Sequence, residues 1–218
     1  WAPRPIKWTA MRYILFDLYG LFYNLKPLSG WEEFAARLGT TADVLRPAFS
    51  RYRPDYDANF LDIDQYWRLV GAELGIEIDW REALAADLAA TGGINEEMVA
   101  FLRELHDAGV PVGLLSNEPK ERTEITRTHE FVSFFNPALF SCELGMAKPD
   151  PAIFEVALER IREVVGEDLH PSEVLFTDDT QVNLDTAREL GFTTHFFDGV
   201  EGLRTVVSEV FDKRDVGR

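Results

Sequence analysis

The sequence predicts an α/β protein: a doubly wound, Rossmann-like parallel sheet core with a small inserted α-helical domain. Three observations support this fold class. Short apolar runs rich in β-forming residues alternate with longer segments of helical periodicity. Several of these runs end abruptly at polar residues, as buried parallel strands do at a ligand-binding edge. One segment near the N-terminus breaks the alternation, since it carries helical stripes and no convincing strand.

The expected strands of the sheet are the apolar runs themselves. They lie at 13–16, 111–115, 138–141, 173–177 and 193–197. Apolar residues at positions i, i+3, i+4 and i+7 predict helices between them. These helices cover 98–105, 154–165 and 183–190. Strand and helix thus repeat in turn, which favours right-handed crossovers in one parallel sheet.

The segment 24–92 predicts a separate helical unit. Its apolar stripes at helical spacing are Trp31, Phe34, Ala35, Leu38 and Ile63, Tyr66, Trp67, Val70, Leu74. We expect four helices packed as a small bundle over the sheet edge, with Thr91–Gly93 as a hinge back into the core. This divides the chain into a core (11–23 and 93–218), a helical cap (24–92) and an N-terminal extension (1–10).

Composition restricts the class of partner. The 218 residues include 22 Lys and Arg against 38 Asp and Glu, a formal net charge of −16. This balance argues against nucleic acid or a membrane as the main partner and leaves room for a small anionic substrate. The single cysteine, Cys142, excludes an intrachain disulfide, and no stretch approaches the roughly 20 apolar residues that span a bilayer. We therefore expect a cytoplasmic protein, and the oligomeric state stays open.

Polar residues follow three of the predicted strands. Asp17 comes after the first, Ser116 and Asn117 after the second, and Asp178 and Asp179 after the fourth. Because parallel strands present their carboxyl ends at one edge of a sheet, these side chains should converge. Three carboxylates in one cleft repel one another, and a hard divalent cation with oxygen ligands removes the conflict. The sequence therefore predicts a Mg²⁺ site.

Four segments of the chain resemble the motifs of the haloacid dehalogenase-like hydrolases, in the family's order. They are FDLYG at 16–20, LLSN at 114–117, GMAKPD at 145–150 and FTDDTQVN at 176–183. The helical insertion after the first segment is similar to the family's small α-helical cap. The third segment resembles that of sugar-phosphate phosphatases and of the phosphatase domain of epoxide hydrolases.

The resemblance implies a role for each motif residue. Asp17 is the nucleophile, Lys148 pairs with it and with the substrate, and Ser116 and Asn117 bind the transferring phosphoryl group. Mg²⁺ is held by Asp17, Asp178, Asp179 and the backbone carbonyl of Tyr19, with Asn183 orienting the acidic pair. Together these roles imply a Mg²⁺-dependent phosphatase that forms an aspartyl-phosphate.

Tyr19 departs from the phosphatase pattern. Phosphatases of this family usually carry a second Asp there as the general acid and base, whereas a tyrosine with a pKa near 10 is a poor base at neutral pH. Tyrosine is instead the pattern of the family's 2-haloacid dehalogenases, which lack the acidic pair and use no metal. The alternatives are thus a 2-haloacid dehalogenase and a catalytically weak member that binds a phosphorylated ligand or a protein.

The predicted cap holds three arginines that could recognise an anionic substrate. They are Arg46, Arg51 and Arg53. A solvated helix face is the favoured explanation for any one of them, with substrate recognition as the alternative.

Overall fold

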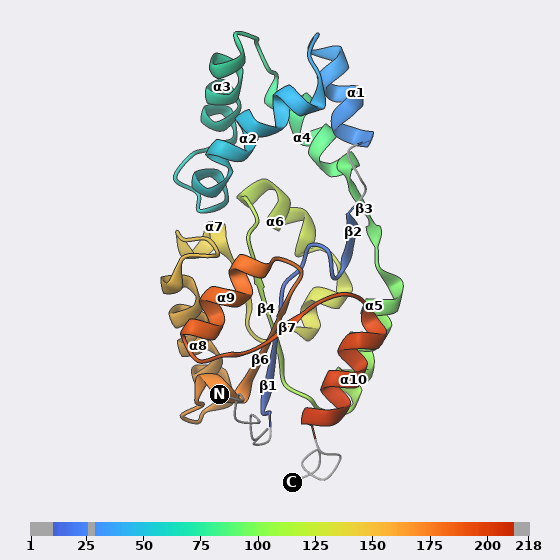
Figure 1. Ribbon diagram of the computed structural model, residues 1–218, viewed down its shortest axis with the longest axis vertical. Coiled ribbons are helices and arrows are strands. Elements are labelled where there is room, and N and C mark those ends of the chain that lie inside the picture. Colours follow the sequence, from blue (N-terminus) through green and yellow to red (C-terminus); the bar gives the residue numbers. More distant parts are fainter. Residues whose placement is uncertain (1–10, 26–28, 212–218) are drawn as a thin grey trace, which may run out of the picture.

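A five-stranded parallel sheet forms the centre of the molecule in the computed structural model, which describes residues 11–25 and 29–211 (Figure 1). Its order is β5-β4-β1-β6-β7. The strands are β1 (Tyr13–Phe16), β4 (Val112–Ser116), β5 (Ala138–Phe140), β6 (Val174–Asp178) and β7 (Thr193–Phe196). The predicted doubly wound α/β core is confirmed, with strand ends within one residue of expectation.

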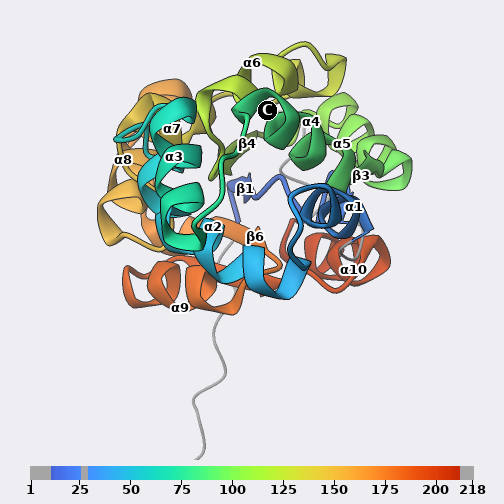
Figure 2. The ribbon, with the colours of Figure 1, turned by 90° about the horizontal axis from the view of Figure 1, so that it is seen from above.

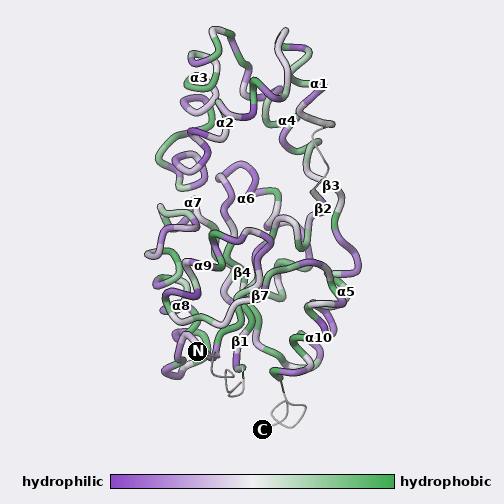
Figure 3. Tube along the Cα trace, in the orientation of Figure 1, coloured by the Kyte–Doolittle hydropathy of each residue, from purple (hydrophilic) through white to green (hydrophobic). Residues whose placement is uncertain are grey.

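Helices cover both faces of this sheet (Figure 2). On one face lie α8 (Pro151–Val165) and α9 (Gln181–Glu189), and on the other α5 (Glu96–Asp107) and α10 (Val200–Val210). The side chains of β1 alternate between these two layers, since Tyr13 and Leu15 join one hydrophobic cluster and Ile14 and Phe16 join the other. Figure 3 shows this hydrophobic stretch in the middle of the core. Burial on both faces explains why the strands are apolar throughout.

Four helices form a second unit at the end of the sheet where β1, β4 and β6 end (Figure 1). These cap helices are α1 (Ser29–Arg37), α2 (Ala42–Asp57), α3 (Ile63–Leu74) and α4 (Trp80–Ala90). They share a hydrophobic core of their own, in which Trp31 stacks on Phe49 at a ring distance of 4.7 Å. A capping box between Asp62 and Gln65 starts α3. The four helices agree with the prediction, while the division at 23/24 and 92/93 stays a prediction.

The two connections to the cap helices are strands, which the sequence did not predict. β2 (Tyr23–Leu25) and β3 (Thr91–Ile94) pair antiparallel as a separate two-stranded sheet. The expectation of no strand in 24–92 is therefore wrong at both ends of that segment. The cause is a close backbone approach: a Cβ on Gly92 would lie 1.6 Å from the carbonyl oxygen of Asn24. Glycine has a low propensity for strands, so the sequence carries no strand signal here. At Gly92, however, only glycine leaves room for β3 to pair with β2.

Two short helices follow the carboxyl ends of β4 and β5. They are α6 (Lys120–Thr126) and α7 (Ser141–Leu144), and both face the cap helices. The remaining short elements are 3₁₀ turns at Glu130–Phe134 and Pro171–Glu173. Within the described ranges, no helix combines the length and apolar character needed to cross a membrane.

Candidate active site

A buried lysine joins two of the predicted site carboxylates. Asp17 directly follows β1, and its backbone N–H donates to the carbonyl of Thr177 in the neighbouring strand β6. The Lys148 Nζ donates to Asp17 Oδ1 at 2.6 Å and to Asp178 Oδ2 at 2.9 Å. The lysine side chain is only 1% exposed, so these ion pairs are shielded from water. Residues 131 positions apart thus meet at the edge where the strands end.

Asp178, the first residue of the acidic pair, accepts three hydrogen bonds. Asp178 is fully buried, and its Oδ1 accepts from the backbone N–H of Thr180 at 2.7 Å. Its Oδ2 accepts from Asn183 Nδ2 at 3.0 Å as well as from Lys148. Asn183 therefore contacts this carboxylate directly, in the orienting position that the sequence suggested.

The second aspartate lies against the loop that follows β1. Gly20 has a φ of +80°, and a Cβ at this position would meet Asp179 Oδ2 at 1.9 Å. Glycine is required here both for the left-handed backbone and for the approach of the carboxylate. The FTDDTQVN motif, which contains Asp179, therefore packs directly against the FDLYG motif, which contains Gly20.

The three carboxylates fit a divalent cation. Asp17, Asp178 and Asp179 each offer an oxygen, and these oxygens lie within 4.8 Å of one another. Lys148 supplies one positive charge against three negative ones, so the group keeps a negative excess that a divalent cation would neutralise. An all-oxygen donor set of this kind suits Mg²⁺.

Burial and the neighbouring charges shift the pKa values of three of these groups. Burial raises the pKa of Asp17 to about 7, with Lys148 opposing and Asp178 adding to the shift. Burial, together with Asp178, also raises the pKa of Asp179. For Lys148, burial acts against the charge, but Asp17 and Asp178 outweigh it and raise its pKa. The lysine is therefore a fixed cation, and the carboxylates are held at an electrostatic cost.

The predicted phosphoryl-binding residues at the end of β4 differ in their surroundings. The Ser116 hydroxyl is fully buried, and within the described residues it has no hydrogen-bond partner. An unpaired buried hydroxyl at a strand end is a free donor for a ligand oxygen. The Asn117 side chain instead brackets the backbone of Lys148, donating to its carbonyl at 2.7 Å and accepting from its N–H at 2.8 Å. The Asn117 amide thus ties the second motif to the third.

The Tyr19 hydroxyl is engaged in a buried network. It donates to Glu118 Oε1 and accepts from Arg122 Nε at 2.7 Å. Its ring stacks on Tyr23 at 5.4 Å. Burial and the Glu118 charge raise the pKa of Tyr19 well above its usual value. The phenol therefore stays protonated with its proton directed at Glu118, which disfavours a role for Tyr19 as the proton donor to a leaving group.

Sequence reasoning missed Glu118 and Arg122. Their spacing of four residues reads as an ordinary surface ion pair on a helix. In the structure Glu118 is fully buried and Arg122 is 5% exposed, and both contact Tyr19 from 99 and 103 positions away. The one sequence feature that could have indicated the network is the position of Glu118 directly after the LLSN motif.

The arginines of α2 point to structural roles. Arg53 Nε donates to Asp57 Oδ1 at 2.7 Å, and Arg51 pairs with Glu73 at 3.4 Å. Arg46 is exposed on α2. Arg51 and Arg53 thus have partners within the cap helices, so their predicted part in substrate recognition has no direct support.

A family model for haloacid dehalogenase-like hydrolases matches residues 11–191. The chain belongs to this family. It is a hydrolase with the family's Rossmann-type core, as the sequence resemblance implied.

Individual relatives give a more detailed comparison with this HAD-like hydrolase. The sesquiterpene phosphatase astK of Aspergillus oryzae is 24% identical over 187 residues, 84% of this chain and 88% of its own length. Bifunctional epoxide hydrolase 2 of Mus musculus is 35% identical over 151 residues, 67% of this chain but only 26% of its own length.

Solved structures share the fold. A HAD family enzyme of Bacteroides thetaiotaomicron, in complex with magnesium and inorganic phosphate, has a TM-score of 0.66 at 22% identity, covering 85% of this chain and 93% of its own. An L-2-haloacid dehalogenase has a TM-score of 0.64 at 22% identity, covering 87% of each chain. Both likenesses concern the fold alone.

Proposed function

We propose that this HAD-like hydrolase is a Mg²⁺-dependent phosphatase that acts on a small phosphorylated molecule through an aspartyl-phosphate on Asp17. The observation that carries the proposal is the group of three carboxylate oxygens within 4.8 Å, joined to the Lys148 ammonium. A phosphatase relative that matches 84% of this chain supports it. The substrate is a small-molecule anion. For its recognition, Lys148 offers a buried ammonium, and Ser116 offers a hydroxyl without a partner among the described residues.

The chain's own residues divide the chemistry between them. An Asp17 oxygen attacks phosphorus and displaces the alkoxide, which takes a proton from solvent water. A second water then attacks phosphorus, breaks the bond to the Asp17 oxygen, and leaves as phosphate that carries the water's protons, which restores the carboxylate. Lys148 neutralises charge beside Asp17 and the substrate, and Ser116 donates to a phosphoryl oxygen as charge builds up on it.

The residues that would hold Mg²⁺ are Asp17, Asp178, Asp179 and the carbonyl of Tyr19. When bound, the ion supplies positive charge to the phosphoryl oxygens. Asn183 and Thr180 keep Asp178 in place through the hydrogen bonds of 3.0 and 2.7 Å. The Asn117 amide is a positioning group for the Lys148 loop, and its backbone N–H keeps the proposed contact with phosphate.

A panel of phosphate monoesters tests this function. The wild-type protein with Mg²⁺ is expected to release inorganic phosphate from at least one of them, and Asp17→Asn is expected to release none above background. EDTA should stop the reaction and added Mg²⁺ should restore it. Phosphate release that is equal in wild type and Asp17→Asn would disprove the assignment.

A second candidate is hydrolysis of a 2-haloacid, which Tyr19 favours. The halide leaves without a proton, so this reaction does not need the Tyr19 hydroxyl, whose proton is hydrogen-bonded to Glu118. It requires chloride release from 2-chloropropionate that survives EDTA. Three clustered carboxylates argue against it, since this reaction uses no metal and the haloacid carboxylate would meet their negative excess without a divalent cation to neutralise it. Absence of chloride release, or release that depends on metal, removes this candidate.

A further inference from the structure

One buried guanidinium links the loop after β1 to the cap helices. The β1 loop, residues 17–22, connects Asp17 to the paired strands β2 and β3. Arg122 on α6 donates through Nε to Tyr19 Oη at 2.7 Å, through Nη1 to Asp87 Oδ2 at 2.9 Å and through Nη2 to Thr91 Oγ1 at 2.7 Å. All three nitrogens are thus engaged, each with a residue of a different element.

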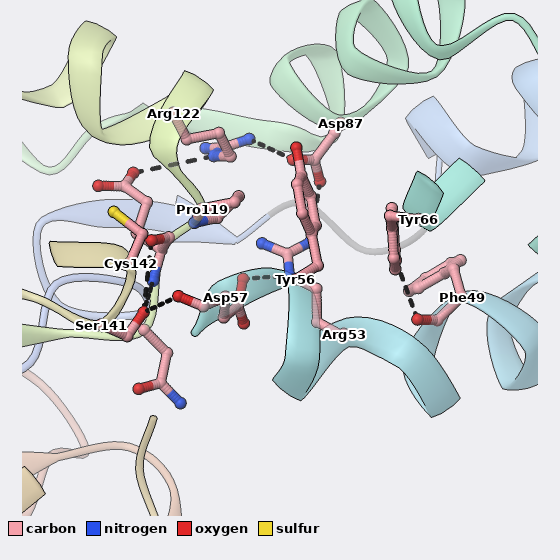
Figure 4. Close-up of polar contacts among 12 residues, drawn as sticks. Phe49, Arg53, Tyr56, Asp57, Tyr66, Asp87, Pro119, Arg122, Ser141 and Cys142 are labelled. Atoms are coloured by element: carbon pink, nitrogen blue, oxygen red, sulfur yellow. Dashed lines mark hydrogen bonds and ion pairs between the residues drawn. The ribbon is translucent and has the colours of Figure 1, made fainter. Parts of the chain in front are cut away.

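The partners of Arg122 lie in the parts of the fold that join cap and core. Asp87 belongs to α4, Thr91 is the first residue of β3, and Tyr19 stands two residues after Asp17. Figure 4 shows Arg122 reaching from α6 to Asp87. The guanidinium also lies over the Tyr19 ring, with its carbon 5.0 Å from the ring centre. A single side chain therefore connects α4 to the β1 loop.

The charges around Arg122 make this link costly to break. Asp87 also faces Arg53 of α2 at 3.8 Å, so it lies between an arginine of the core and one of the cap helices. On the other side, Glu118 Oε1 accepts from Tyr19 and from Thr126 Oγ1 at 2.7 Å, while its Oε2 is buried with no partner among the described residues. Separating Arg122 from Asp87 would remove the shortest ion pair of this group and leave each charge only its more distant partner, Glu118 at 3.9 Å for Arg122 and Arg53 at 3.8 Å for Asp87. Weakening an ion pair that holds a buried arginine is unfavourable.

Two further contacts hold the end of α2 to the core. The Ser141 hydroxyl donates to the carbonyl of Asp57 at 2.6 Å and accepts from the N–H of Glu118 at 2.8 Å. The Tyr56 hydroxyl donates to Glu121 Oε2 at 2.9 Å. Figure 4 shows the contact between Ser141 and Asp57. Of these bridges, Arg122 is the one that reaches the β1 loop.

We propose that Arg122 is a positioning residue that sets the β1 loop, and with it Asp17, according to the placement of the cap helices. Tyr19 is the loop residue that Arg122 contacts, which explains why its hydroxyl donates a hydrogen bond to Glu118 instead of serving as an acid. The kinetic part of this inference rests on the proposed phosphatase function, and its structural part does not.

Hydrogen exchange tests the structural part without any substrate. The β1 loop is held by Phe22 N–H donating to Leu18 O at 2.8 Å and Gly20 N–H donating to Tyr23 O at 3.1 Å. Asp87→Asn, an isosteric change in α4 that lies 67 and 65 positions from Gly20 and Phe22, is expected to speed exchange of these two amides, as is Arg122→Gln. Arg127→Gln is the matched control, because Arg127 pairs with Glu143 at 2.6 Å on the surface. Unchanged exchange in Asp87→Asn would overturn the proposal.

Kinetics tests the functional part. Arg122→Gln should lower kcat about 10- to 100-fold with a smaller change in KM, since an error of position near the reacting group can cost on the order of 100-fold. Arg122→Lys should not rescue kcat, because one ammonium cannot span three acceptors. Full rescue by lysine would show that charge alone matters and would contradict the inference.

A mutant cycle separates positioning from general destabilisation. Tyr19→Phe and Asp87→Asn each remove one hydrogen-bond partner of Arg122. In the wild-type background, the two changes together should therefore lower kcat by less than the product of their separate factors. In the Arg122→Gln background, neither change should lower kcat further. Coupling that persists without Arg122 would refute the link. If the wild-type protein hydrolyses no phosphate ester, the proposed function fails, and the exchange experiment still decides the inference.

Discussion

Replacing Lys148 by methionine tests the electrostatic design of the site. The substitution keeps an unbranched apolar stem and removes the only ammonium that contacts Asp17 and Asp178, at 2.6 and 2.9 Å, in the described site. Both carboxylates are at most 10% exposed, so water cannot replace the lost charge. Removal of one partner of a buried ion pair lowers the free energy of unfolding by about 3–5 kcal/mol.

The expected change in thermal stability follows from the size of the chain. For a domain of roughly 150–250 residues, 1 kcal/mol shifts Tm by about 2–4 °C, so Lys148→Met should lower Tm by about 6–20 °C. Thermal unfolding followed by circular dichroism at pH 7.5 in EDTA measures this shift. Lys120→Met is the control, because Lys120 is exposed at the start of α6.

Two further arms make the result specific to charge. Adding Asp17→Asn to Lys148→Met removes one uncompensated carboxylate and should restore part of the lost stability. The loss should also be smaller at pH 5.5, where a carboxyl group in the pocket can keep its proton. If Lys148→Met is no less stable than Lys120→Met at pH 7.5, the account of a buried, lysine-compensated carboxylate group is wrong.

Four other predictions concern the same site. Because the pKa of Asp17 is raised to about 7, the folded metal-free protein binds a proton that the unfolded chain releases above about pH 4; stability in EDTA should therefore fall as pH rises from about 4 to 7, and Asp17→Asn should remove this slope in thermal melts. Mg²⁺ should raise Tm more at pH 8 than at pH 5.5, where protons compete, and calorimetry should find this binding lost in Asp179→Asn. Gly20→Ala should abolish Mg²⁺ binding, since its Cβ would meet Asp179 Oδ2 at 1.9 Å, and a normal Mg²⁺ affinity would contradict that contact. Tyr19→Phe should lower kcat by the same factor for phenyl and 4-nitrophenyl phosphate, and a selective loss with the poorer leaving group would identify Tyr19 as the acid after all.

The sequence was sufficient for those parts of the site that lie directly after strands. Asp17, Ser116 and Asp178 follow apolar runs whose pairing in one sheet brings their ends together, so local patterns predict the convergence. The position of Lys148 came from motif resemblance, because it lies in a loop between α7 and α8.

The network around Tyr19 could not be predicted in this way. Glu118 and Arg122 have an ordinary helical spacing, and their burial results from tertiary contacts with residues 99 and 103 positions away. The strand β3 was missed for a similar reason. Its two glycines are unfavourable for a strand in isolation, and the pairing with β2 becomes visible only when the backbones lie side by side.

Trapping the covalent intermediate tests the central claim most directly. The protein is mixed with a turned-over phosphate ester and Mg²⁺, quenched during turnover, reduced with borohydride and analysed by peptide mass spectrometry. An aspartyl-phosphate is reduced to homoserine, which we expect at position 17. Homoserine at another aspartate, or none during active turnover, would contradict the assignment of Asp17 as the nucleophile.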